Sequence, residues 1–156
     1  MLCSITCSRN KADEVSCSTS KRTTILDKRQ GTFCKRERLV SQKQIEELFS
    51  GSPSAAAFPL RVVYINKVRA LGAEPVQVLV SVPKKRFHHA VDRNRVKRQI
   101  REAYRIHKTL LSDALPADRQ VLLAFVWLSD RHWSSDKIEQ RMVGLLKRVA
   151  EGQDKK

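Results

Sequence analysis

The stretch that most constrains the fold is residues 90–105, which read AVDRNRVKRQIREAYR. At about 100° per residue, its pattern predicts an amphipathic helix. We expect Asp92 to be the N-cap, because its carboxylate can accept hydrogen bonds from the free N–H groups of the first turn. The apolar side continues past residue 105 and comprises Val96, Ile100, Ala103, His107 and Leu111. The polar side comprises Asn94, Arg98, Arg101, Arg105 and Lys108, flanked by Arg93 and Lys97.

The charge of this region points to an anionic partner. Between Lys84 and Lys108 there are ten Lys or Arg residues and only two acids, Asp92 and Glu102. A solvated helix face normally mixes charges of both signs at i,i+4 spacing, because like charges repel. A guanidinium group can hold two phosphate oxygens at once. The pattern therefore favours a phosphate-binding helix over a solvated helix flank.

The whole chain carries the same signal. It has 31 Lys or Arg residues against 16 Asp or Glu residues, a formal net charge of +15, which suits nucleic acid or an anionic membrane surface. No apolar run is long enough to span a bilayer, and the first ten residues lack the apolar core of a signal peptide. We therefore expect a soluble, cytoplasmic protein without a membrane partner.

Composition divides the chain into three parts. Residues 1–31 are rich in Ser, Thr, Lys and Arg without a period, and we expect a disordered basic extension. Residues 32–152 are expected to form one domain, and residues 153–156 a disordered tail. All four cysteines precede residue 35, with no C-x-x-C pair, so reduced thiols are favoured over a zinc site or disulfides.

The domain alternates helix and strand patterns. Ser41 and Gln44 have the spacing of a capping box, which predicts a short helix ending at Gly51. Further elements are expected as strands at 58–65, 76–82 and 120–128, and as helices at 91–111 and from Ser134 or Ser135 onward. The order is α-β-β-α-β-α, with room for a fourth short strand. It predicts an α/β (α+β) two-layer sandwich.

One dense run carries a family resemblance. Arg93-Asn94-Arg95-Val96-Lys97-Arg98 is followed by Ile100-Arg101-Glu102-Ala103-Tyr104-Arg105 and preceded by Ser81-Val82-Pro83-Lys84-Lys85. These residues resemble the signature of the bacterial ribonuclease P protein subunit, and fainter similarity extends from about residue 33 to about residue 152. The resemblance implies a fold similar to that of ribosomal-protein domains, with a left-handed β-α-β crossover. Generic crossovers are right-handed, so the sequence pattern alone does not predict this hand.

The resemblance also implies a function. It implies the protein subunit of ribonuclease P, which binds the catalytic RNA and the 5′ leader of precursor tRNA. The subunit assists RNA-catalysed, Mg²⁺-dependent endonucleolytic removal of that leader, with Mg²⁺ held mainly by the RNA. Carried over residue by residue, the implied RNA contacts are Lys84, Lys85, Arg93, Asn94, Arg95, Lys97, Arg98, Arg101 and Arg105.

For the leader, the resemblance implies a cleft beside the sheet. Aromatic candidates are Phe33, Phe58 and Tyr64, whose rings can stack with unpaired bases, although each is equally well explained as a core residue. The chain departs from the family pattern at Ile45, where many members have an aromatic residue. It also departs in the loop 86–89, which lacks the usual glycine.

Catalysis by the protein itself is not expected. Carboxylates are sparse, and no His, Cys or Asp pattern suggests a catalytic or metal-ligating set. A ribosomal protein that binds rRNA is the main alternative, because it shares the charge and the phosphate chemistry. A DNA-binding module and a protein-only nuclease fit the pattern less well. No protein partner is evident.

Overall fold

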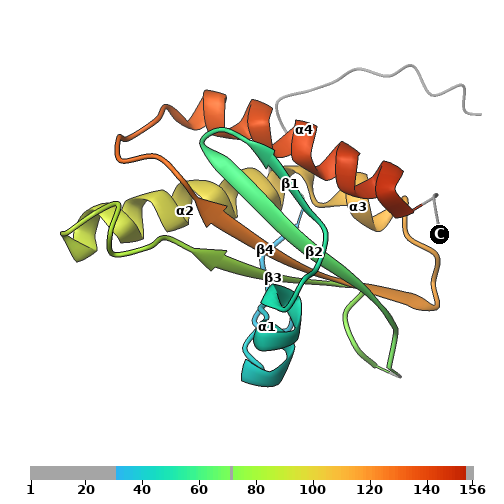
Figure 1. Ribbon diagram of the computed structural model, residues 1–156. Helices are drawn as coiled ribbons and strands as arrows, with labels where there is room; N and C mark the ends of the chain where they lie inside the picture. The colour runs from blue at the N-terminus through green and yellow to red at the C-terminus, as the bar shows by residue number, and fades with distance from the viewer. Residues whose placement is uncertain (1–30, 71, 154–156) are drawn as a thin grey trace, which may run out of the picture.

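The computed structural model describes residues 31–70 and 72–153 (Figure 1). Its elements, in chain order, are α1 (Gln42–Phe49), β1 (Ser54–Ala57), β2 (Leu60–Val68), β3 (Val76–Ser81), α2 (Ala90–His107), α3 (Thr109–Ser112), β4 (Arg119–Trp127) and α4 (Ser135–Gln153). The predicted α+β class is confirmed, and the fourth strand is β1.

The four strands form one sheet in the order β1-β2-β4-β3. β2 runs antiparallel to both β1 and β4, whereas β3 and β4 are parallel and are joined through α2 and α3. The segment before α1 lies along the free edge of β3, where the Leu39 N–H donates to the Val78 carbonyl at 3.1 Å. The Val78 N–H donates in turn to the Glu37 carbonyl at 2.7 Å. This pairing covers part of a sheet edge that would otherwise offer unpaired backbone groups.

Helices lie on both faces of the sheet, but unequally (Figure 1). α2 and α4 pack on one face, where side chains such as Ile100, Phe125 and Met142 are fully buried. The short α1 packs on the other face, where Leu48 lies against Leu122 and Ala124. β4 is buried on both faces for this reason, as its run of apolar residues indicates. The main two-layer sandwich is present, and α1 adds a partial third layer.

The start of the sheet differs from the prediction. Phe58 and Pro59 were expected inside a strand, but they form the turn between β1 and β2, which begins at Leu60. Proline has no N–H to give to a strand ladder, so a turn suits it. β1 is hidden in the sequence because Ser-Ala-Ala-Ala has low strand propensity.

The helix caps also differ. α2 begins at Ala90 with His89 as its N-cap, so the prediction of Asp92 as N-cap is wrong. Asp92 lies in the first turn, where its negative charge is still favourable, and its Oδ1 is 3.1 Å from Nε2 of His132. Ser41 does precede α1, but its side chain makes no capping hydrogen bond. The expected helix 91–111 is divided into α2 and α3 near Lys108.

Several predictions concern the ends of the chain. Residues 1–30 and 154–156, which make up most of both expected tails and contain three of the four cysteines, lie outside the described residues. The fourth, Cys34, is exposed and has a free thiol. Within the described part of the chain, no helix is long and apolar enough to cross a membrane.

Candidate nucleic-acid interface

The apolar side of α2 is buried as predicted. Val96, Ile100 and Ala103 lie in the core, together with Tyr104, which was not among the residues predicted on the apolar side. A second side of α2 meets the start of α4, where the Gln99 amide donates to the Trp133 carbonyl and contacts the Ser135 hydroxyl. By helical spacing, the predicted basic residues lie mainly on the remaining sides of α2.

The basic face of α2 carries cations without protein partners. Asn94, Arg95 and Arg98 are exposed, and Lys97 and Arg101 are half-buried. Within the described residues, none of these four cationic side chains forms an ion pair or a side-chain hydrogen bond. Their charge is therefore available to phosphate groups.

Two predicted contact residues on α2 already have structural partners. Arg93 donates from Nη1 to the carbonyls of Phe87 and His88, at 2.9 and 2.7 Å. Arg105 donates two hydrogen bonds, of 2.9 and 2.6 Å, to the carboxylate of Glu102. It also donates a hydrogen bond to the Gly31 carbonyl at 3.0 Å. The hydrogen bond from Arg105 holds the pKa of Glu102 below its usual value.

The loop before α2 presents Lys84 and Lys85, which are both exposed. Its position is fixed by contacts with the β4–α4 loop. Arg86 Nη1 lies 2.9 Å from Asp130 Oδ1, and the buried Phe87 ring stacks on His132 at 4.8 Å between centroids. These contacts fix the loop that carries the two lysines directly before α2, and the lysines and the cations of α2 are together named the basic surface.

The three aromatic candidates lie in separate settings. Phe33 packs edge-on against Tyr104, with ring centroids 5.8 Å apart, at the edge of the core. Phe58 is 56% exposed in the β1–β2 turn and contacts Trp133. Tyr64 is half-buried on the α4 side of β2. The structure does not bring the three rings into one contact cluster. Trp133 was missed in the sequence analysis, although a tryptophan in a predicted loop was a usable signal.

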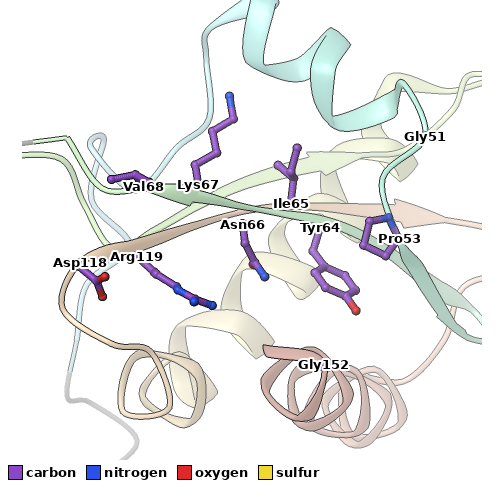
Figure 2. Close-up of a pocket in the computed structure, with 10 residues that line it drawn as sticks. All are labelled: Gly51, Pro53, Tyr64, Ile65, Asn66, Lys67, Val68, Asp118, Arg119 and Gly152. Carbon is purple, nitrogen blue, oxygen red and sulfur yellow. The ribbon is translucent and has the colours of Figure 1, made fainter. Parts of the chain in front are cut away.

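A hollow surrounds the end of β2, but it is not one enclosed pocket (Figure 2). Ile65 and Lys67 point toward α1, whereas Tyr64 and Asn66 point toward α4. These side chains therefore lie on opposite faces of the sheet and cannot contact one small ligand together. The Tyr64 hydroxyl lies against Gly152, where a Cβ atom would come within 2.7 Å of it.

The sheet face that carries α1 is partly open. α1 covers Val63 and its neighbours, and the alternation of β2 places Arg61 on the same face. Arg61 pairs in register with Val126, which in turn pairs with Ser81. Arg61 is exposed and the other two are half-buried. This part of the face, beyond α1, is therefore only partly covered.

The described residues contain no group of three or more His, Cys, Asp or Glu side chains that could hold a metal ion. Two isolated pairs, His107 with Glu139 at 2.7 Å and His132 with Asp92 at 3.1 Å, join neighbouring elements instead.

Comparison with known proteins decides the family. The profile of the Ribonuclease P family matches residues 33–150. A ribonuclease P protein component from Porphyromonas gingivalis is 43% identical over 122 residues, which cover 74% of this chain and 85% of that protein. This chain belongs to the Ribonuclease P family.

Two solved structures share the fold of this Ribonuclease P family member. A mutant RNase P protein from Staphylococcus aureus has a TM-score of 0.58 at 21% identity, covering 74% of this chain and 89% of that chain. The RNase P protein from Thermotoga maritima has a TM-score of 0.53 at 20% identity, covering 72% and 96%. At these identities the likeness concerns the fold alone.

Family membership confirms the resemblance drawn from residues 81–105, and it connects the chain with ribonuclease P and tRNA processing. The roles of individual residues in RNA binding stay predictions.

Proposed function

We propose that this chain binds the catalytic RNA of ribonuclease P through the basic face of α2 together with Lys84 and Lys85. One observation carries the proposal: one side of α2 is buried in the core, while Arg95, Lys97, Arg98 and Arg101 have no partner among the described residues. Mutual repulsion among these cations favours an occupied state in which phosphates neutralise them.

The proposed division of labour leaves hydrolysis to the RNA. Mg²⁺ would be held by the RNA, where it would supply charge stabilisation at the scissile phosphate and an activated water. The protein screens phosphate repulsion where catalytic RNA and precursor tRNA meet, which lowers the Mg²⁺ concentration needed for assembly. Sparse carboxylates in the chain support this division. The expected cytoplasmic location belongs to the same proposal.

The 5′ leader is proposed to lie on the open part of the sheet face beside α1, near Arg61. Of the three aromatic candidates, Phe58 is the one whose exposure suits a contact with unpaired bases. The Phe33 ring packs against Tyr104, and the Tyr64 ring packs beside α4, so both rings have less surface free for a base.

Reconstitution tests the proposed function. Precursor tRNA is incubated at low Mg²⁺ with a bacterial catalytic RNA alone, with the protein alone, and with both. We expect 5′-leader removal only when both are present. Cleavage by a preparation of the protein free of RNA, or no gain when the protein is added, would refute the proposal. Copurification with ribosomal subunits in place of a single RNA would favour the ribosomal alternative.

A further inference from the structure

An aromatic pair, Phe58 and Trp133, is partly exposed to solvent at the end of the sandwich where α2 begins. The Phe58 ring lies edge-on to Trp133, with centroids 5.5 Å apart and an interplanar angle of 73°. Trp133 is half-buried, and its indole Nε1 donates to the Ser129 hydroxyl at 3.2 Å, which fixes the ring. Phe58, at 56% exposure, leaves much of its ring in water. Trp133 packs against the edge of the core, and Phe58 extends this aromatic surface into solvent.

Two cationic side chains lie near this aromatic pair. Lys137 Nζ lies 5.9 Å from the centroid of the Trp133 ring, and Arg131 lines the same surface hollow as Phe58, Ser129 and Trp133. The carboxylate in the hollow, Asp130, is paired with Arg86. A ligand suited to this arrangement has a flat apolar ring and a negative charge, as a nucleotide does.

The loop that lines the hollow contacts both the loop of Lys84 and Lys85 and the first turn of α2. Arg86 joins the β4–α4 loop to the loop of Lys84 and Lys85, and His132 joins it to Asp92 in the first turn of α2. We therefore expect an RNA strand held by the lysines and by α2 to extend toward the aromatic pair.

We propose that Phe58 and Trp133 form a stacking site for an unpaired base of RNA. The inference rests on the proposed function, since it assumes that RNA lies on this surface, and it adds a site built by two segments far apart in the sequence. Stacking requires a free base face, so the site selects single-stranded over double-stranded RNA and tolerates different bases.

The test uses the full chain and a short single-stranded RNA oligonucleotide. We expect Phe58→Leu to bind the oligonucleotide about tenfold more weakly, as loss of one stacking contact predicts, with the salt dependence of binding unchanged. Phe58→Tyr keeps the ring and should bind like wild type. Val68→Ala, at a position 87% exposed at the other end of β2, is the matched surface control.

Tryptophan fluorescence gives a second readout. Trp127 is fully buried, so a change on adding the oligonucleotide reports Trp133, and we expect quenching that Trp133→Phe removes. Equal affinities of wild type and Phe58→Leu, or fluorescence unchanged at saturation, would overturn the stacking site. Binding of catalytic RNA separates the two proposals, because Phe58→Leu should leave it within about twofold of wild type while variants on α2 lose it.

Discussion

At the scale of the residue, Tyr104 shows how one buried side chain anchors α2 in the core. It is 2% exposed and packs against Phe33 and Phe125. Burial raises the pKa of the Tyr104 hydroxyl well above its usual value, and the charge of Glu37 raises it further. Glu37 is itself paired with Lys108 at 2.7 Å, which ties the segment before α1 to the end of α2.

The raised pKa of Tyr104 predicts a loss of stability at high pH. The unfolded chain releases this proton near pH 10, whereas the folded protein retains it. The contribution is therefore complete below pH 10 and declines as pH rises, by up to about 1.4 kcal/mol per pH unit. Urea unfolding should show a steeper decline for wild type than for Tyr104→Phe. Parallel profiles would contradict the assignment, since every other titrating group is common to both proteins.

A second prediction at this scale concerns Glu102, whose carboxylate forms an ion pair with Arg105. Glu102→Gln removes the negative charge paired with Arg105, which keeps its hydrogen bond to the Gly31 carbonyl, so affinity for catalytic RNA should rise about threefold, the scale of one exposed ion pair. Glu151→Gln changes the net charge equally at an exposed position on α4 and serves as the control. A filter-binding titration in which both variants gain equally would mean that overall charge, not Arg105, is responsible.

At the scale of the element, the cations of α2 divide into two groups. Arg95 and Arg98 extend into solvent, whereas Arg93 holds the carbonyl groups of the preceding loop. The family motif places all three together, but the structure gives them different tasks.

Arg93→Ala should therefore destabilise the protein, and Arg95→Ala should not. Loss of two charge-assisted hydrogen bonds is expected to cost about 1.5 kcal/mol, whereas an exposed substitution should stay within about 0.5 kcal/mol. Denaturant unfolding of the two single variants measures this difference directly. If both have the stability of wild type, Arg93 does not organise the loop.

How far the sequence predicts this structure depends on how far apart two contacting residues lie along the chain. The burial of Val96 and Ile100 follows from helical period alone, and it was predicted correctly. The task of Asp92 depends on His132, forty residues away, and local capping rules do not include such a partner. The pairing of Phe58 with Trp133 depends on the whole fold, since the two residues lie on segments brought together only by the sheet.

At the scale of the whole molecule, the domain is organised with α2 and α4 on one sheet face and the smaller α1 on the other (Figure 1). The family match begins at residue 33, after the basic stretch that the sequence analysis set apart. The division of the chain at this point stays a prediction.

Deletion of residues 1–30 tests that division. The deleted part carries six Lys or Arg residues and three acids, so little of the net charge is lost. We expect the melting temperature to stay within about 2 °C of wild type and holoenzyme activity to persist. A truncated protein that does not fold, or a full-length protein whose folding requires zinc, would contradict the prediction.

The central claim is that the solvent-facing cations of α2 bind RNA. Two double variants of equal charge test it: Arg95→Ala with Arg98→Ala on α2, and Arg141→Ala with Lys147→Ala on α4, all four being exposed positions. The measurement is the affinity for catalytic RNA as a function of salt concentration. The α2 variant should bind more weakly, with a salt slope shallower by roughly 0.9 per lost contact, and the α4 variant should stay close to wild type. Equal effects of the two variants, with both folded, would show that α2 is only a solvated flank.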